Sequence, residues 1–144
     1  MIIDTSALLA VLLDEPEGAS FETAIAHDPY PRISAATYLE AGIIVDSRGD
    51  PVRSRYLDAF LAGADISIES ITGEQATIAR QAYQDFGKGS GHAARLNFGD
   101  CFTYALAKAY DEDVLYKGHD FSHTDLRPAK TQPITPRTAP LDTI

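Results

Sequence analysis

The sequence is poor in the features that mark membrane-bound and secreted proteins. The longest apolar run, residues 7–13, is far shorter than the roughly 20 residues that a membrane-spanning helix requires. Neither Lys nor Arg precedes this run, and Asp4 interrupts the apolar N-terminal segment, so we expect no signal peptide. Cys101 is the single cysteine, which rules out an internal disulfide and is compatible with a reducing compartment. We therefore expect a cytoplasmic protein that does not associate with a membrane.

Basic residues are also scarce. The sequence has 12 Lys and Arg against 21 Asp and Glu, which gives a formal net charge of −9. This balance argues against a protein that coats nucleic acid by neutralising its phosphates. It fits a group of acids that holds divalent cations, or a basic protein partner. Local basic patches remain compatible with a nucleic-acid substrate.

What is present is the composition of one folded domain. The chain has 144 residues, of which 44% are hydrophobic, and this is enough for a single packed core. Towards the C-terminus, Pro133, Pro136 and Pro140 predict a loose, extended tail. We expect a domain over residues 1–130 and a proline-rich tail over residues 131–144.

Short apolar segments alternate with longer amphipathic ones. The expected strands cover residues 2–3, 32–34, 66–68 and 113–116, and the expected helices cover residues 7–13, 19–26, 35–48, 51–64, 73–86 and 98–110. This alternation predicts an α/β fold with a mainly parallel central sheet and right-handed crossovers. In the helix over 73–86, the residues expected to point inward are Ala76, Ala79, Tyr83 and Phe86. In the helix over 98–110, the expected inward residues are Phe102, Ala105, Leu106 and Ala109, and a separate face carries Asp100, Thr103 and Tyr104.

Acidic residues fall at the predicted ends of strands or starts of helices. Asp4 follows the first strand, and ligands of α/β sheets bind outside the carboxyl ends of the strands. Aspartate is also a favoured helix N-cap, so both a capping and a functional role stay open for Asp4. Asp100 lies in the first turn after the cap residue Asn97, where the helix dipole alone also favours an acid. Asp120 lies just beyond the last predicted strand.

A fourth acid, Glu40, lies within a predicted helix. It shares one helical stripe with Ile43 and Ile44, which predicts partial burial. A buried glutamate is costly unless it is paired, hydrogen-bonded or bound to a cation. The alternative is a boundary residue whose carboxylate reaches out to water.

Parallel strands bring these acids towards one edge of the sheet. Carboxylates gathered in one cleft repel each other and raise each other's pKa unless a cation neutralises them. Mg²⁺ and Mn²⁺ accept oxygen ligands of this kind. Such ions activate water and stabilise charge on a phosphoryl oxygen, so the pattern predicts phosphodiester hydrolysis.

Four fragments carry a family resemblance when they are taken in order: Asp4-Thr5-Ser6, Tyr38-Leu39-Glu40, Leu96-Asn97-Phe98-Gly99-Asp100-Cys101 and Gly118-His119-Asp120-Phe121. Over about residues 1–127 the chain resembles the PIN-domain ribonucleases, and among them the VapC-type toxins of type II toxin–antitoxin modules. The resemblance implies a three-layer α/β/α sandwich and cleavage of RNA. The chain after Arg127 departs from the short final strand that is usual in this family.

The resemblance also implies roles for individual residues and partners. Asp4, Glu40 and Asp100 would bind Mg²⁺ or Mn²⁺, Asp120 would complete the acidic site, and Thr5 or Ser6 would orient a metal-bound water. The implied partners are an RNA substrate, a second copy of the chain in a homodimer, and a VapB-like antitoxin.

Substrate contacts are harder to assign. The stretch 87–92 lacks the spacing of a phosphate-binding P-loop and predicts a mobile loop beside a cleft. Residues that could contact RNA phosphates are Lys88, His92, Arg95 and Lys117, and ordinary solvated surface is the alternative for each. Tyr104 could stack on a base or lie in the core. The pair His119 and His123 is expected to be ordinary surface, and Cys101 a small buried residue.

Two other functions fit parts of the pattern. A receiver-like signalling domain also has an acidic Mg²⁺ pocket, and Lys117 lies where such a domain has a lysine. Its acidic pair after the first strand and its phosphorylated Asp after a middle strand are poorly matched here. A PIN-like module that binds RNA or a partner without cleavage is the second alternative.

Overall fold

The computed structural model describes residues 1–133, so residues 134–144 of the expected tail lie outside the described part of the chain. The strands are β1 (Ile2–Ile3), β2 (Arg32–Ser34), β3 (Ser67–Glu69) and β4 (Val114–Leu115). The helices are α1 (Thr5–Leu12), α2 (Gly18–His27), α3 (Ala35–Ser47), α4 (Pro51–Gly63), α5 (Gly73–Phe86) and α6 (Phe98–Tyr110). A short 3₁₀ turn, η1, covers Asp120–His123.

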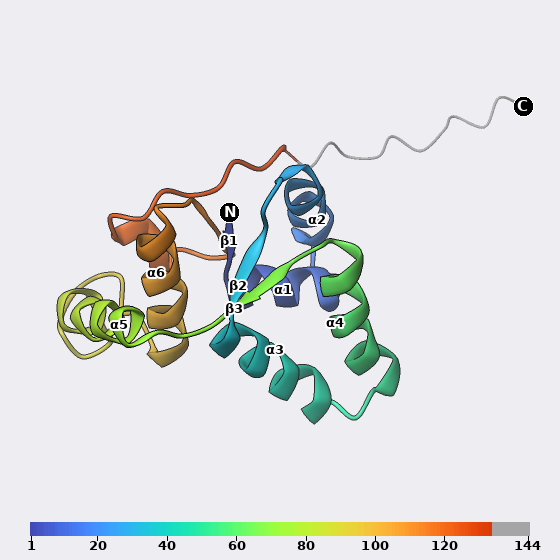
Figure 1. Ribbon diagram of the computed structural model, residues 1–144, viewed down its shortest axis with the longest axis horizontal. Coiled ribbons are helices and arrows are strands. Elements are labelled where there is room, and N and C mark those ends of the chain that lie inside the picture. The colour runs from blue at the N-terminus through green and yellow to red at the C-terminus, as the bar shows by residue number, and fades with distance from the viewer. Residues whose placement is uncertain (134–144) are drawn as a thin grey trace, which may run out of the picture.

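The four strands form one parallel sheet in the order β3-β2-β1-β4. Ile2 of β1 lies opposite Arg32 of β2 on one side and Val114 of β4 on the other. Helices α1, α2 and α4 lie on one side of the sheet, and α5 and α6 lie on the other (Figure 1). The predicted α/β/α sandwich with a parallel sheet is therefore confirmed.

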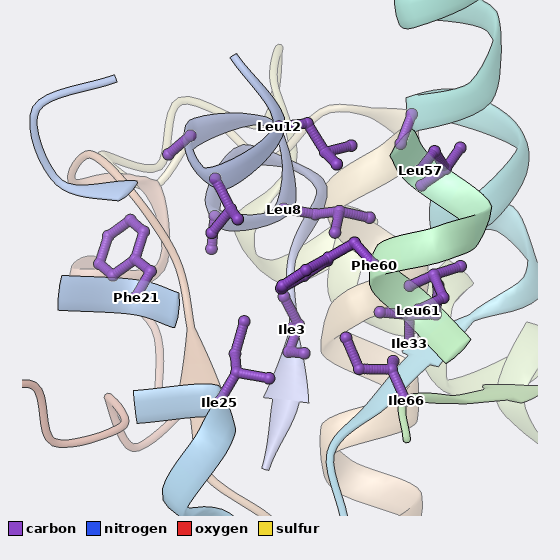
Figure 2. Packing of buried hydrophobic residues seen from close by; sticks show 14 of the residues in the cluster. Ile3, Leu8, Leu12, Phe21, Ile25, Ile33, Leu57, Phe60, Leu61 and Ile66 are labelled. Atoms are coloured by element: carbon purple, nitrogen blue, oxygen red, sulfur yellow. The ribbon is translucent and has the colours of Figure 1, made fainter. Parts of the chain in front are cut away.

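Neighbouring residues of β1 enter different cores, because successive side chains of a strand point to opposite faces. Ile3 packs with Leu8, Leu12 and residues of α2 and α4 in the larger core (Figure 2). Its neighbour Ile2 packs with Leu106 of α6 on the opposite face of the sheet. Burial on both faces explains why β1 and β4 are wholly apolar.

Two helices begin directly where a strand ends. The Asp4 side chain accepts a hydrogen bond from the Ser6 amide at the start of α1, and Ser34 does the same for the Ala36 amide at the start of α3. A side-chain acceptor satisfies one of the amides that the first turn leaves unpaired. The chain therefore turns from strand to helix without a loop, and this places Asp4 at the carboxyl edge of the sheet.

The predicted inward faces of α5 and α6 need correction. On α5 the buried residues are Gln75, Ala79 and Ala82, whereas Ala76 and Tyr83 are exposed. The predicted Ala79 is buried and the predicted Phe86 packs against the same core. The prediction missed Ala82, whose small side chain, like that of Ala79, lets α5 approach α6. On α6, Ala109 is exposed.

The separate polar face predicted for α6 is also wrong. Thr103 and Tyr104 are both buried, because α6 contacts β1, β2, α3 and α5 at once. A helix surrounded in this way buries much more than a single stripe.

The far edge of the sheet extends beyond β4. The amide of Val114 donates to the carbonyl of Arg127 at 2.9 Å, and the amide of Ala129 donates to the carbonyl of Val114 at 2.8 Å. These bonds flank a single parallel bridge between Val114 and Pro128. Pro128 has no amide hydrogen to donate, which suits an edge position. None of the described helices is long and apolar enough to cross a membrane.

Candidate metal centre

Asp4 occupies a buried position at the carboxyl edge of the sheet, with only 4% of its surface exposed. Its Oδ2 accepts hydrogen bonds from the Ser6 amide at 3.0 Å and the Ser6 hydroxyl at 2.7 Å. Its Oδ1 accepts a hydrogen bond from the hydroxyl of Thr103 at 2.7 Å. Asp4 is thus the N-cap of α1, and its second oxygen points to α6. The capping role and the functional role are compatible.

Ser6 joins the ends of two neighbouring strands. Its hydroxyl donates to Asp4 and accepts a hydrogen bond from the backbone amide of Lys117, just after β4, at 2.9 Å. The other candidate hydroxyl residue, Thr5, is 8% exposed. The Ser6 hydroxyl thus donates one hydrogen bond and accepts another, and these two bonds link the ends of β1 and β4 at this edge of the sheet.

Asp100 lies in the first turn of α6 and takes part in a capping box with Asn97. The Asn97 amide donates to Asp100 Oδ2 at 3.0 Å, and the Asp100 amide donates to Asn97 Oδ1 at 2.9 Å. Burial raises the pKa of Asp100 to about 7; the Asn97 amide opposes this, and the charges of Asp4, Asp120 and Glu40 raise it further. The structure thus brings the other three predicted acids within electrostatic reach of Asp100.

Glu40 reaches this region from α3. A Cβ atom built on Gly99 would lie 2.5 Å from Glu40 Oε2 and 2.9 Å from Oε1. The carboxylate therefore rests against the backbone of the first turn of α6, directly beside Asp100, where only glycine leaves room for it. Sequence reasoning quoted Gly99 in a motif but assigned it no role.

Asp120 is the first residue of η1 and is exposed. The turn is anchored by the next residue, Phe121, which is 2% exposed and packs edge-on against Tyr116 with 5.3 Å between the ring centroids. An exposed acid on an anchored turn is held near Asp100 but stays accessible to water.

None of the four acids has a basic partner in the part of the chain that the structure describes, a feature that they share with exposed acids such as Glu22 and Asp85. Within residues 1–133, none of the salt bridges involves Asp4, Glu40, Asp100 or Asp120. The same part of the chain also contains no three acidic, histidine or cysteine side chains already gathered around one point for a metal ion. Hydrogen bonds hold Asp4 and Asp100 in place, and the like charges repel. The oxygen donors fit a divalent cation, with some rotation of the side chains towards it.

The predicted substrate-binding residues have different surroundings. Lys88 and Arg95 are exposed, and His92 packs edge-on against Phe86 with 5.0 Å between the ring centroids. The Lys117 ammonium pairs with Glu15 and, at 3.4 Å, with Glu17. These positions leave Lys88 and Arg95 the most available for phosphate contacts.

For Tyr104 the prediction of base stacking needs correction. The residue is 6% exposed, and its hydroxyl donates to Asp125 at 2.7 Å. Burial raises the pKa of the Tyr104 hydroxyl, as does the bond to Asp125. A ring buried to this extent has no free face for a nucleobase, so Tyr104 is a core residue. Cys101 is buried as expected.

Thr103 is a residue near the site that sequence reasoning did not select. It lies three residues after Asp100 and therefore on the same face of α6. That spacing was the available signal, but the face was taken for a solvated one.

A parallel α/β/α sandwich with an acidic cluster at its carboxyl edge is the architecture observed, and comparison with known proteins identifies it. The model of the PIN domain family matches residues 1–126, and the chain belongs to this family. Its relatives are VapC ribonucleases. "Ribonuclease VapC28" of Mycobacterium tuberculosis is 52% identical over 129 residues, which cover 90% of this chain and 97% of the relative. "Ribonuclease VapC42" of the same species is 44% identical over 91% of this chain and 100% of the relative.

Solved structures share the fold at lower sequence identity. Mycobacterium tuberculosis VapC20, described as a sarcin–ricin loop cleaving toxin, superposes with a TM-score of 0.71 and 14% identity, covering 91% of this chain and 98% of that one. A toxin–antitoxin complex from Klebsiella pneumoniae gives a TM-score of 0.62 at 18% identity, covering 84% and 89%. Family membership also removes the receiver-like alternative.

Proposed function

We propose that this protein is an endoribonuclease that hydrolyses RNA phosphodiester bonds with Mg²⁺ or Mn²⁺ and acts as the toxin of a type II toxin–antitoxin module. The observation that carries the proposal is the position of Asp100, which is partly buried beside Asp4, Glu40 and Asp120 without a basic partner among residues 1–133. Such a cluster is stable as carboxylates only when a cation joins it. The names of the VapC ribonuclease relatives support RNA as the substrate.

The acids have different parts in this proposal. Asp4, Glu40 and Asp100 would hold the cation, which when bound supplies charge neutralisation at the phosphoryl oxygen and a more acidic water. Asp120, exposed on η1, would act at the outer side of the site. Since the Ser6 hydroxyl is committed to Asp4 and Lys117, we assign the orientation of the attacking water to Thr5.

The surface around the acids carries the candidate substrate contacts. Lys88 and Arg95 would meet phosphates of the RNA. Lys117 would meet them only if its ammonium left Glu15 and Glu17. We keep His92 in the same loop as a weaker candidate because its ring already packs on Phe86.

We further propose a homodimer in the cytoplasm, neutralised by a VapB-like antitoxin. The toxin–antitoxin complex among the structural neighbours supports a protein partner for this fold. A net charge of −9 and an acidic cleft favour an antitoxin that presents Arg or Lys to the site.

The decisive experiment is sequencing of RNA 5′ ends after brief expression of the protein in cells, with Asp100→Asn as the matched control. Reproducible new ends that are absent with Asp100→Asn would support RNA cleavage at this site. If the wild-type protein and the variant gave the same ends, while the protein still bound RNA or an antitoxin, the alternative of a non-cleaving PIN module would replace the proposal.

A further inference from the structure

The hydrogen bond between Thr103 and Asp4 is unlike the other side-chain hydrogen bonds of the described chain. Within residues 1–133 it is the one in which both partner residues are buried, with 0% of Thr103 and 4% of Asp4 exposed. It joins residues 99 positions apart in the sequence, across the junction of β1 and α6. Burial of a hydroxyl without a partner is costly, so this contact determines the orientation of both groups.

Counting the acceptor sites of Asp4 shows what this bond leaves open. A carboxylate has about four lone-pair sites, two on each oxygen. Oδ2 receives two hydrogen bonds, both from Ser6, which use its two sites. Oδ1 receives the one bond from Thr103. One site on Oδ1 therefore remains for an external partner.

Thr103 also connects two of the acids. It is three residues after Asp100 on α6, so its bond to Asp4 ties the end of β1 to the helix that carries Asp100. The bond thereby limits both the rotation of the Asp4 carboxylate and the separation of these two acids.

We propose that Thr103 is a positioning residue that directs the remaining lone pair of Asp4 Oδ1 at the divalent cation. This inference rests on the proposed metal-dependent function and adds a specific residue and a specific ligating atom to it. Partners of this kind, which hydrogen-bond a metal ligand, typically contribute tenfold or more to metal affinity.

The test measures Mn²⁺ binding directly, by electron paramagnetic resonance of free Mn²⁺, in parallel with thermal unfolding without metal. The variants are Thr103→Val, which replaces the hydroxyl by a methyl of similar size, and Thr103→Ser, which keeps a donor. Thr23→Val on α2 is the matched control, because its hydroxyl bonds only the Ala19 carbonyl of its own helix.

Thr103→Val is expected to weaken Mn²⁺ binding by about tenfold. Thr103→Ser should restore most of the affinity, and Thr23→Val should leave it unchanged. RNA cleavage by Thr103→Val should recover at high Mn²⁺ concentration with the KM for RNA unchanged. A purely structural role would lower the melting temperature but would not produce this recovery.

Two outcomes overturn the inference in different ways. If the wild-type protein binds Mn²⁺ and Thr103→Val binds it equally well, Thr103 serves only the fold, and the proposed function stands. If the wild-type protein binds no Mn²⁺, the metal-dependent function fails together with the role of Thr103. Should Thr103→Val fail to fold, Thr103→Ala takes its place; if neither folds while Thr103→Ser does, the hydroxyl is needed for folding and the inference is overturned.

Discussion

The acids at the two ends of the parallel sheet have different kinds of partner. At the amino end, Glu112 pairs with Arg32, while Asp111 and Asp113 pair with Arg127 at 2.9 and 2.8 Å. At the carboxyl end, Asp4 and the acids around it lack a basic partner within residues 1–133, and hydroxyl and amide groups hold Asp4 and Asp100 instead.

This contrast separates structural acids from site acids. Paired acids at the amino end are neutralised by the protein itself and need nothing further. At the carboxyl end the hydrogen-bond donors orient Asp4 and Asp100 but add no positive charge. Burial and the neighbouring carboxylates therefore raise the pKa of Asp100. Under the proposed function, a cation from solution neutralises this cluster.

The largest effect is expected from removal of charge at the carboxyl end. Asp4→Asn, Glu40→Gln and Asp100→Asn should each lower RNA cleavage by roughly a hundredfold or more, because each variant loses a ligand of the cation. The shapes are conserved, and Asn remains a good N-cap at position 4, so circular dichroism should show an intact fold. Initial rates on a defined RNA measure the effect.

Two matched variants test whether the loss of cleavage is specific to these three acids. Asp120→Asn should have a smaller effect, since an exposed outer acid can act through water. Asp113→Asn, at the amino end, should keep the wild-type rate. If all three variants at positions 4, 40 and 100 cleaved RNA at the wild-type rate with added Mg²⁺, the acids at the carboxyl end would have no role in cleavage.

A smaller effect on cleavage is expected from crowding Glu40. In Gly99→Ala the added methyl would overlap the Glu40 carboxylate, so cleavage should fall by about tenfold through loss of its position. Alanine is otherwise a better helix former than glycine. The melting temperature should therefore fall little.

The control is Gly73→Ala, at the first residue of α5, where an added Cβ meets nothing within 4 Å. It should leave cleavage unchanged. Equal cleavage rates for Gly99→Ala and Gly73→Ala would show that cleavage does not depend on the position of Glu40 against α6.

At the amino end the expected effect is on stability alone. Arg32→Met removes the cation beside Glu112, where both side chains are largely buried, and should reduce the free energy of unfolding by roughly 1–2 kcal/mol. Urea unfolding measures this loss. Affinity for Mn²⁺ should stay at the wild-type level. A tenfold loss would contradict this prediction, because it would show that the ion pair at the amino end affects the metal site at the carboxyl end.

The smallest effect concerns pH in the absence of metal. The folded-state pKa of Asp100, about 7, lies above its ordinary value of 3.8, so the folded protein binds the extra proton more tightly than the unfolded chain. The stabilisation from this proton is complete below pH 4 and is lost as pH rises towards 7. Metal-free wild-type protein should therefore lose about a few degrees of melting temperature across this range relative to Asp100→Asn.

Calorimetric melting curves at several pH values test this. If the melting temperatures of wild-type protein and Asp100→Asn changed with pH in the same way, the pKa of Asp100 would not be raised in the folded protein.

Local sequence signals predicted most of the architecture. The short apolar segments, the amphipathic helices and the cap residue Asn97 are confirmed within one or two residues. These signals are local because a cap or a helical stripe involves residues at most four positions apart. The faces of α5 and α6 were misassigned, since which face is buried depends on the neighbour against which a helix packs.

The acids of the candidate site were also accessible from the sequence, but their surroundings were not. Residue type, order and spacing pointed to Asp4, Glu40, Asp100 and Asp120. Nothing in the spacing indicated that Glu40 rests on Gly99 or that Tyr104 is in the core, because these contacts join separate elements.

The sequence by itself determined the alternation of strands and helices, the parallel sheet and the identity of the four acids, since hydrophobic period and capping chemistry are properties of neighbouring residues. Only the tertiary structure decided that Thr103 reaches Asp4 and that basic residues pair with the acids at the amino end of the sheet but, within residues 1–133, not with the four acids of the candidate site. The physical reason is that hydrogen bonds and ion pairs act over a few ångströms, and packing of the helices on the sheet sets which distant groups come that close.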